Sequence, residues 1–433
     1  MPASPARQLA FQVLQLVNQG GYASDLLHSS RARGLSAADR RLATELVMGV
    51  LRWRAQLDYA IAIAAKRAVA RIAAIPLTAL RLGAYQLRFL DRVPAMAAVH
   101  ESVELAKADS PPAAAFVNAV LRHLPREPAA ALLAREGNLK RRREVEFSHP
   151  AWLLERWSRN FSPEAAAAIA EYDNQPPPVA IRGTLEGEGI ELAPGRILAS
   201  CRRVIAGDAT KLEGFRLGAF AIQDEASQLI PHLLEAEQGN SVLDVCAAPG
   251  AKTSLLKALA PQARVVALEL HWSRAQTLRR RLGAGAAIVV ADASRPLPLA
   301  AKFDRILVDA PCTGTGTLAR NPEIRWRLRP EDPTRLAELQ SAILRRVAAA
   351  LRPGGRLVYS VCSIEPEEGA GVIAAVLAQT PELTLVPVAR VLARLREAGA
   401  LVQSPPTSGA FLQLLPGALA SDGFFAAILE RAR

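Results

Sequence analysis

The chain has 433 residues, of which half are apolar, and it carries a formal net charge of +12. That length exceeds one ordinary domain, so we expect two or three folded domains with ample core. The N-terminus, residues 1–7, holds no apolar run typical of a signal peptide, and the longest apolar stretch, 59–80, is broken by Lys66, Arg67 and Arg71. This composition excludes a disordered chain and a membrane-spanning one, and we expect no membrane partner.

Cysteine and histidine usage bounds the chemistry. The four cysteines (Cys201, Cys246, Cys312 and Cys362) have no CxxC spacing, and the six histidines are scattered. This pattern disfavours a zinc site and a disulfide framework, so we expect no bound metal. A reducing cytoplasm is the expected location.

Residues 7–125 are predicted to be helical throughout. Ser36, followed three residues later by Asp39, is typical of a helix start. Pro76, Pro94 and the pair 111–112 divide the region into further helices. Apolar residues recur at helical spacing near the start of the region: Leu9, Ala10, Val13, Leu14 and Val17.

Positive charge is concentrated in the N-terminal third. Residues 1–150 hold 21 Lys+Arg against 12 Asp+Glu, a net +9, whereas the remainder holds 32 against 29, a net +3. This asymmetry favours a polyanion-binding module, although a solubilising surface would have the same composition. Six arginines cluster before and along one predicted helix, where they either contact phosphate or form a solvated helix face: Arg31, Arg33, Arg40, Arg41, Arg52 and Arg54.

The same region carries a family pattern over roughly residues 5–125. The segments ARQLAFQVL, DRRLATELVMGVLRW, RLGAYQL, VPAMAAVHESVELAK and FVNAVLR follow one another there. Their order resembles the all-helical RNA-binding domain of the NusB antitermination factor. The resemblance implies that this part of the chain binds RNA.

The middle of the chain is less regular. Residues 126–150 become polar and charged, with a basic run at 140–143, and we predict a linker there. Short helices are expected over 151–160 and 163–173. A break at 176–178 and a strand-like piece around 179–182 follow.

From residue 240 onward, predicted strands alternate with helices. The strands are expected at 241–246, 264–269, 286–291, 304–309 and 355–361. Such alternation indicates a doubly wound α/β sheet of the Rossmann-like kind. Ligands of these sheets bind outside the carboxyl ends of the strands.

The first strand end has the features of a nucleoside cradle. Gly250 lies in a turn of small residues before a helix start, where free N–H groups and the helix dipole favour a ligand. The next strand ends on Glu269, at a distance in sequence suited to ribose hydroxyls, and the third ends beside Asp292, a partner for an adenine amino group. An ordinary turn that binds nothing is the alternative. The turn comprises Cys246, Ala247, Ala248, Pro249, Gly250, Ala251 and Lys252.

Two cysteines stand at the ends of the last two predicted strands. Cys312 follows Asp309, and Cys362 follows the fifth strand. Most cysteines in such places are small apolar core residues, but two on one edge favour a thiolate nucleophile, whose pKa loop N–H groups or Lys252 could lower. A nucleoside cofactor together with a nucleophilic thiolate suits methyl transfer from S-adenosylmethionine to carbon 5 of a pyrimidine. Addition of sulfur to carbon 6 would make carbon 5 reactive.

The motifs DVCAAPGAKT, DAPCTGTG followed by RNPEIRW, and YSVCSIEPEE resemble the RNA (cytosine-5)-methyltransferases of the Sun/Fmu type. The resemblance covers nearly the whole chain. It implies that Cys362 is the attacking nucleophile and that Cys312 assists release of the product. It also assigns the turn 246–252, Glu269, Asp292 and Asp309 to the cofactor, with Asp309 placed to orient the target base.

The resemblance further implies three domains and an RNA substrate. We expect a NusB-like RNA-binding domain over 1–143, a connecting RNA-binding subdomain over 144–235 and a catalytic domain over 236–433. Residues 422–425 resemble the last strand of the family. The implied substrate is 16S ribosomal RNA outside the complete subunit, and a monomer is expected.

The sequence departs from the family pattern in four places. Ala251 replaces a second glycine, which is tolerated if its φ is negative, and Glu269 stands where Asp is common. Val361 replaces a Thr before Cys362, which puts a hydrogen bond to that thiolate in doubt. The middle segment has Arg182-Gly183-Thr184 where the family has a piece like RVN.

Other classes of protein fit the sequence less well. A nicotinamide-dependent oxidoreductase would need G-x-G-x-x-G, whereas this turn has a single glycine. An amino-group methyltransferase would place an aromatic residue at position 312. A non-catalytic RNA-binding or assembly factor on the same fold remains the alternative, against which the presence of both cysteines argues.

Overall fold

The computed structural model describes residues 3–107, 111–134, 136–183, 185 and 189–433. The chain packs as two compact units. The helical unit consists of Met1–Pro176 with Leu318–Arg327, and the α/β unit consists of Pro177–Thr317 with Leu328–Arg433. Of the residues singled out from the sequence, the first two of the chain and Thr184 lie outside the described residues.

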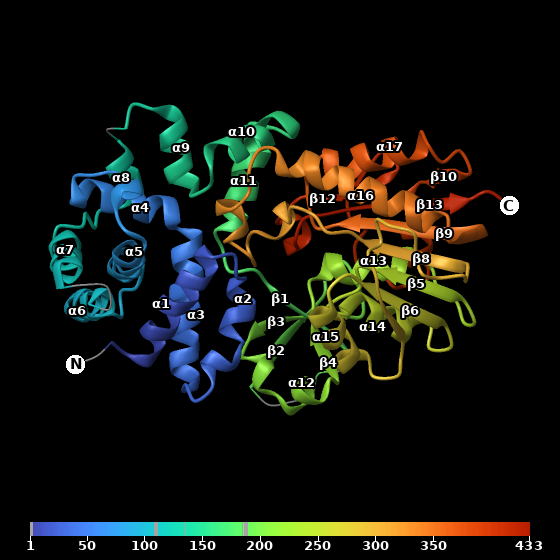
Figure 1. The fold of residues 1–433 in the computed structure, drawn as a ribbon, viewed down its shortest axis with the longest axis horizontal. Helices are drawn as coiled ribbons and strands as arrows, with labels where there is room; N and C mark the ends of the chain where they lie inside the picture. The colour runs from blue at the N-terminus through green and yellow to red at the C-terminus, as the bar shows by residue number, and fades with distance from the viewer. Residues whose placement is uncertain (1–2, 108–110, 135, 184, 186–188) are drawn as a thin grey trace. The chain divides into compact units, whose positions relative to one another are not determined.

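The helical prediction for residues 7–125 is confirmed in the described part of that range, where helices follow one another (Figure 1). Pro94 immediately precedes α6 and Pro111 begins α7, while Pro76 lies in the first turn of α5, where its missing N–H has no acceptor to lose. The helices are α1 (Pro5–Asn18), α2 (Ala23–Leu27), α3 (Ala37–Arg52), α4 (Arg54–Ala65), α5 (Ala74–Phe89), α6 (Ala95–Ala106), α7 (Pro111–Arg122), α8 (Ala129–Leu133), α9 (Leu139–Phe147), α10 (Ala151–Asn160) and α11 (Pro163–Asp173).

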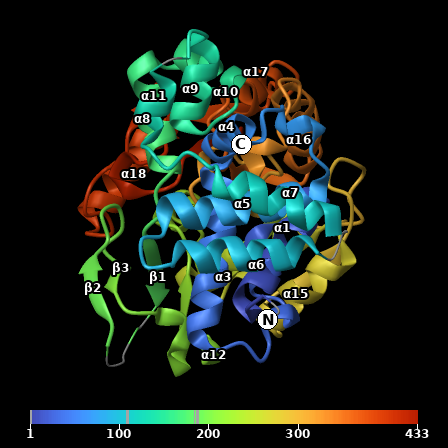
Figure 2. The same cartoon turned by 90° about the vertical axis from the view of Figure 1, so that its left-hand side faces the viewer.

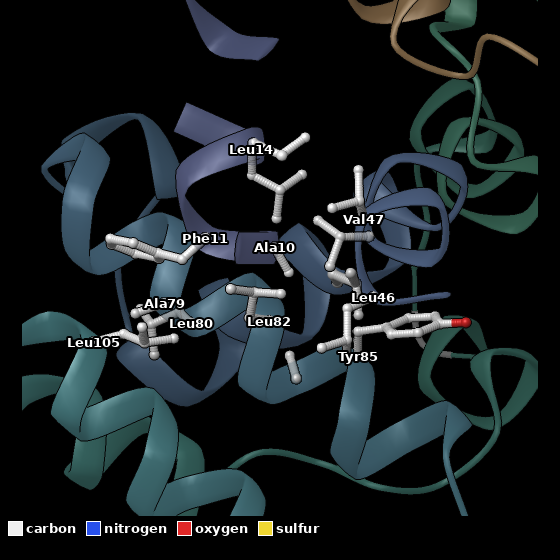
Figure 3. Packing of buried hydrophobic residues seen from close by; sticks show 14 of the residues in the cluster. Ala10, Phe11, Leu14, Leu46, Val47, Ala79, Leu80, Leu82, Tyr85 and Leu105 are labelled. Carbon is white, nitrogen blue, oxygen red and sulfur yellow. The ribbon is translucent and has the colours of Figure 1, made fainter. Parts of the chain in front are cut away.

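The core of this unit lies between α1, α3 and α5. Leu14 of α1, Leu46 of α3 and Leu82 of α5 are buried in one cluster, which Figure 3 shows from close by. Gly49 is needed on α3, because a Cβ there would lie 1.9 Å from the Tyr85 ring of α5. Helices α5, α6 and α7 pack against one another and run side by side in Figure 2.

Two local predictions have different outcomes. The Ser36 cap is confirmed, since Ser36 Oγ accepts from the Asp39 amide at 3.1 Å. The linker predicted over 126–150 is wrong, because α8 and α9 form there. Helix α9 contains the basic run and shows no apolar periodicity; it is capped by Asn138 and packs against α4 and α10. The sequence-based boundary at 143 falls inside α9, and the division into three domains stays a prediction.

The segment 318–327, which follows the Cys312 motif in sequence, packs within the helical unit. Arg325 is fully buried there and donates to Ser148 O at 3.2 Å, Asn174 Oδ1 at 2.8 Å and Asp173 O at 3.0 Å. Trp326 Nε1 donates to Leu51 O at 2.7 Å. The RNPEIRW motif is therefore part of the helical core rather than of the sheet.

The second unit is built on a large mixed sheet with the order β11-β12-β13-β9-β8-β5-β6-β7, and β10 pairs with β13 (Figure 1). Strands β9, β8, β5, β6 and β7 are parallel, and β13 is antiparallel to β9. All five strands predicted from the sequence are present. The strands are β5 (Ser241–Val245), β6 (Arg264–Glu269), β7 (Ala287–Val290), β8 (Phe303–Asp309), β9 (Leu351–Val361), β10 (Leu383–Val386), β11 (Thr407–Ser408), β12 (Phe411–Leu414) and β13 (Phe424–Arg431).

Helices cover both faces of this sheet, which confirms the doubly wound arrangement. Val242 packs in one cluster and its neighbour Leu243 in another, because successive strand residues point to opposite faces. The first cluster includes residues of α13 (Glu225–Leu233), α14 (Ala251–Leu259), α15 (Trp272–Leu282) and α18 (Val388–Glu397). The second includes residues of α16 (Asp332–Ala348) and α17 (Val372–Leu377).

A smaller antiparallel sheet precedes the large one, with the order β2-β3-β1-β4. It comprises β1 (Val179–Gly183), β2 (Glu191–Pro194), β3 (Cys201–Ala206) and β4 (Phe220–Ile222), with α12 (Glu213–Leu217) before β4. The strand-like piece predicted around 179–182 is β1, and the helices predicted at 151–160 and 163–173 are α10 and α11. Among the described residues, no helix combines the length and apolarity needed to cross a bilayer.

Candidate active site

The carboxyl ends of β9, β8, β5, β6 and β7 form one continuous edge, since these strands are neighbours in this order. The turn 246–250 follows β5 there, and Ala251 is the first residue of α14. Gly250 has φ +98°, and a Cβ on it would lie 2.7 Å from Leu278 Cδ1. Ala251 is absent from the residues with positive φ, so the expected tolerance of this departure from the family pattern is confirmed.

A buried carboxyl group, that of Asp244, stabilises the turn. Thr253 Oγ1, in the first turn of α14, donates to Asp244 Oδ2 of β5 at 2.5 Å. Burial raises the pKa of Asp244 to about 7, although the hydrogen bond from Thr253 opposes this shift. This hydrogen bond therefore links the strand before the turn to the helix after it.

Glu269 and Asp292 stand at the next two strand ends. Glu269 is 2% exposed, and its carboxylate accepts from Ala248 N at 3.3 Å and from His271 N at 3.1 Å. Asp292 accepts from Ser294 N at 2.9 Å and Ser294 Oγ at 2.6 Å, and these bonds lower the pKa of Asp292. The structure thus joins Glu269 directly to the turn and places Asp292 one strand further along the edge.

Lys252 and Asp309 form an ion pair between the turn and β8. Lys252 Nζ lies 2.7 Å from Asp309 Oδ2, and Ser360 Oγ of β9 donates to Asp309 Oδ1 at 2.9 Å. The ammonium group also lies 5.3 Å from the centre of the Phe424 ring. Burial disfavours the charged ammonium, but attraction to Asp309 and to Cys362 outweighs it and raises the pKa of Lys252.

The two cysteine side chains that the sequence placed on one edge of the sheet lie close together. Cys312 Sγ and Cys362 Sγ are 3.4 Å apart, and both side chains are partly exposed. The hydrogen bond between the thiols and burial raise the pKa of Cys312 well above its usual range, and the negative charge of Glu368 acts in the same direction. Two sulfurs from different strand ends are therefore available to one substrate atom or its neighbours.

The two cysteine loops are also tied by backbone contacts. Gly316 N donates to Cys362 O at 3.0 Å, and Gly423 N donates to Gly316 O at 2.7 Å. A Cβ on Gly316 would lie 2.1 Å from Gly423 O, so only glycine permits this crossing. The segment 422–425, expected as a strand, contributes the start of β13 at Phe424 and this contact.

Glu368 was not assigned a role from the sequence, although it lies in the YSVCSIEPEE motif. It is fully buried in a π-helical turn, Glu367–Gly371. Its Oε1 accepts from Thr313 N at 2.8 Å and from Gln340 Nε2 at 2.9 Å. Its Oε2 accepts from Ser363 Oγ at 2.5 Å and from Thr313 Oγ1. A third acid in the motif was the available signal, but its partners Thr313 and Gln340 are remote in sequence.

The thiols of the other two cysteines also have raised pKa values. Burial and nearby carboxylates raise the pKa of Cys246 to about 12, and burial raises that of Cys201 to about 12. Both are therefore poor nucleophiles. Val361, where the family has Thr, is buried among apolar residues of the sheet core, so this departure concerns packing.

The edge suits a positively charged nucleoside cofactor. Glu269 provides carboxylate oxygens at the turn, and Leu270, which follows it, is 51% exposed and offers an apolar surface for a ring. The carboxylates of Glu269, Asp292 and Asp309 complement a cationic group such as a sulfonium. In the smaller sheet, Arg182 donates to Gln223 Oε1 at 3.3 Å and to Ser254 Oγ of α14 at 3.4 Å, which places its guanidinium beside the turn.

Comparison with known families agrees with this arrangement. Residues 231–430 match the family described as 16S rRNA methyltransferase RsmB/F, and residues 4–126 match the NusB family. Ribosomal RNA small subunit methyltransferase B of Klebsiella pneumoniae is 35% identical over 99% of this chain and 98% of its own length. A probable methyltransferase of the same name from Bacillus subtilis is 32% identical over 98% of both chains.

Solved structures share the fold. The structure named PH0851 covers 100% of both chains with a TM-score of 0.83 at 22% sequence identity. NSun6 from Pyrococcus horikoshii, solved with SFG, covers 65% of this chain and 98% of its own, with a TM-score of 0.52 at 18% identity. At these identities the likeness concerns the fold alone.

Proposed function

This chain belongs to the RsmB/F family of 16S ribosomal RNA methyltransferases, and from that membership we propose how its own residues carry the reaction. The family reaction is S-adenosylmethionine-dependent methylation of carbon 5 of cytosine. The observation that most supports this reaction for the present chain is the pair of thiols 3.4 Å apart beside the Lys252–Asp309 ion pair.

Cys362 is the proposed nucleophile. Its thiolate sulfur bonds to carbon 6 of the cytosine, and the ring electrons then make carbon 5 nucleophilic. Lys252 is the proposed counter-charge near this sulfur, since attraction to Cys362 contributes to the raised pKa of Lys252. After carbon 5 has received the methyl group, a base removes the carbon 5 proton, the bond between sulfur and carbon 6 breaks, and the thiolate is regenerated.

Cys312 is proposed to assist that release. The raised pKa of Cys312 supports a protonated thiol, which can donate a hydrogen bond to the other sulfur. Asp309, held by Lys252 and Ser360, is proposed to orient the target base. These three roles come from the family resemblance and are supported by the geometry.

The cofactor is held, in this proposal, by the turn 246–252 and by Glu269, Asp292 and Asp309. When bound, S-adenosylmethionine supplies a methyl group on a positively charged sulfur. Glu269 binds the ribose hydroxyls, and Asp292 accepts from the adenine amino group. Gly250 allows the turn to approach the ligand closely, because no side chain intervenes.

The helical unit is proposed to bind the RNA. Of the six arginines clustered in sequence, Arg31, Arg33, Arg40 and Arg41 are exposed. Arg52 instead donates to Ala319 O at 3.1 Å, and Arg54 lies over the Trp326 ring at 5.4 Å. The four exposed guanidinium groups are therefore the proposed phosphate contacts. A partly assembled subunit as substrate, a monomeric state and a cytoplasmic location stay predictions.

The function is tested by incubating the protein with isotopically labelled S-adenosylmethionine and 16S ribosomal RNA, then digesting the RNA to nucleosides. We expect the label in 5-methylcytidine at a single position. Label in a nucleoside methylated on an exocyclic amino group would refute attack by carbon 5. RNA binding without any methyl transfer would instead indicate a non-catalytic RNA-binding factor.

A further inference from the structure

One carboxylate joins the two cysteine loops. Glu368 accepts hydrogen bonds from Thr313, which follows Cys312, and from Ser363, which follows Cys362. Through these two neighbours it links strand ends that are 50 residues apart in sequence. The two loops that carry the sulfur atoms are therefore joined by a carboxylate that is hydrogen-bonded to the residue following each cysteine.

The donors around Glu368 are fixed by a second layer of contacts. Gln340 Nε2 donates to both Glu368 Oε1 and Pro311 O, while Gln340 Oε1 accepts from Tyr359 at 3.1 Å. The single hydrogen of the Tyr359 hydroxyl is shared with Glu368 O, which lies 2.6 Å from the hydroxyl oxygen. This pattern fixes the orientation of the Gln340 amide, so that its N–H groups face the carboxylate.

All four groups around the carboxylate act as donors. A protonated carboxyl group would have to direct its own hydrogen at one of them, whereas an ionised one accepts from all four. Burial raises the pKa of Glu368, and the hydrogen bonds from Ser363, Thr313 and Gln340 oppose that shift. The geometry thus fits an ionised carboxylate enclosed by its donors.

The charged groups around the two thiols are distributed unevenly. The hydrogen bond to Cys362 and burial raise the pKa of Cys312 most, and the negative charge of Glu368 adds to them. Lys252, paired with Asp309, acts on Cys362. The negative charge of Glu368 disfavours a second negative charge at Cys312 and so favours the thiol form of that residue.

We propose that Glu368 is a positioning residue that sets the spacing of the two thiols and keeps Cys312 protonated, so that Cys312 donates its hydrogen to Cys362. This assignment rests on the roles proposed above for the two cysteines. In this proposal the different roles of the two cysteines depend on a third residue, Glu368. Loss of the Glu368 charge should therefore raise the thiolate fraction at Cys312.

Thiol alkylation measures this without RNA. The full-length protein, kept reduced with a phosphine, is pulsed with iodoacetamide at a series of pH values, and each cysteine is quantified by peptide mapping at low conversion. In the unsubstituted protein, Cys362 should react at least about tenfold faster than Cys312 between pH 7 and 9, since one unit of pKa is a factor of ten. Faster alkylation of Cys312 would overturn the proposal with no variant needed.

The variant Glu368→Gln keeps the shape of the side chain and removes its charge. We expect the pH profile of Cys312 alkylation to move to lower pH and its rate at pH 8 to rise about tenfold. Glu338→Gln, the same change on the exposed face of α16, serves as the matched control and should leave both profiles unchanged. An unchanged Cys312 profile in folded Glu368→Gln would contradict the proposal.

Steady-state kinetics separates positioning from mere packing. Glu368→Gln should lower kcat while leaving KM for RNA unchanged, and Glu368→Asp, which retains the charge, should restore the Cys312 alkylation profile. If the thiols show the expected order but cytosine is not methylated, the proposed function fails and this inference stands. If cytosine is methylated but the thiol order is reversed, only this inference fails.

Discussion

Each unit of the molecule encloses a buried polar network, and the two networks differ in what they hold. In the helical unit, the Arg325 guanidinium donates to backbone carbonyls and to the side chain of Asn174. In the α/β unit, the Glu368 carboxylate accepts from residues that flank two thiols. Both charged groups are fully buried, so burial alone does not distinguish structure from chemistry.

The difference lies in the partners. A buried charge of either sign must be hydrogen-bonded, because an unpaired one costs several kcal/mol, on the order of the stability of the whole fold. Arg325 meets that requirement with carbonyl oxygens that take part in no reaction. Glu368 meets it with groups that position sulfur atoms. The reactive neighbours, rather than the buried charge, identify the functional network.

The largest effect is expected from removing the nucleophile. Cys362→Ala should lower methyl transfer by at least about 10⁴-fold and form no denaturation-resistant RNA adduct. Cys312→Ala should instead accumulate that adduct, because release stalls. Radiolabel transfer and denaturing electrophoresis measure both. The reverse pattern would exchange the roles of the two sulfurs, and Cys201→Ala, in β3 of the smaller sheet, is the control.

The next largest effect is expected from breaking the structural network. Arg325→Ala leaves several buried acceptors unpaired, each costing about 1–3 kcal/mol, so we expect a loss of unfolding free energy of at least about 3 kcal/mol. Chemical denaturation followed by circular dichroism measures it. Alkylation rates of Cys312 and Cys362 in the folded variant should not change. A change in their order would mean that the two networks are coupled.

Acidification should lower the unfolding free energy through His149, a buried histidine of the helical unit. Burial and the neighbouring Arg325 lower the pKa of His149 from 6.5 to about 4, although the Asp173 carboxylate, 3.4 Å away, opposes the shift. The unfolded chain therefore binds the proton first, and this contribution to stability, present above pH 6.5, is lost as pH falls towards 4. The loss is at most about 3 kcal/mol.

Unfolding midpoints between pH 7 and 4 test this dependence on His149. His149→Gln should flatten the slope. His232→Gln makes the same substitution in the other unit, where burial also lowers the pKa of His232 to about 4. Comparing the two variants separates the contribution of His149 to the slope from that of His232. Equal slopes in His149→Gln and the unsubstituted protein would rule out this histidine as the source.

The smallest effect is expected from the exposed charges of the helical unit. Replacing Arg31, Arg33, Arg40 and Arg41 by Ala should weaken RNA binding and reduce the slope of log affinity against log salt by about 3. Filter binding at several salt concentrations measures the slope. Arg345→Ala with Arg346→Ala, at the end of α16 that precedes β9, is the control. An unchanged slope in the fourfold variant would refute the proposed phosphate contacts.

Substitution is the appropriate test of this unit because a deletion is confounded. Removal of residues 1–143 would cut α9 and strip Trp326 of its contact with Leu51. Removal of the whole N-terminal part would leave the segment 318–327 without the core in which it packs. Either truncation therefore changes more than RNA binding.

Much of the sheet and of its site was predictable from sequence. Strand β6 has the predicted bounds, and β7 spans 287–290 against a predicted 286–291, because apolar runs between turn residues mark buried parallel strands. The meeting of Cys312 and Cys362 followed from the rule that parallel strands present their carboxyl ends at one edge.

What escaped prediction depended on contacts distant in sequence or on elements without periodicity. Helix α9 is too charged to show an apolar face. Glu368 acts through Thr313, which is 55 residues away. Arg52 and Arg54 looked like surface cations, yet their contacts lie in a segment more than 260 residues further along the chain.

The central claim is that the sulfur of residue 362 bonds to the target cytosine. Its most direct test is a ribosomal RNA fragment containing 5-fluorocytidine, whose fluorine blocks removal of the carbon 5 substituent and traps the intermediate. Incubated with S-adenosylmethionine and the protein, then digested and sequenced by tandem mass spectrometry, it should give a methylated fluorocytidine linked to Cys362. A link to Cys312, or methyl transfer with no protein-linked nucleotide, would contradict the account.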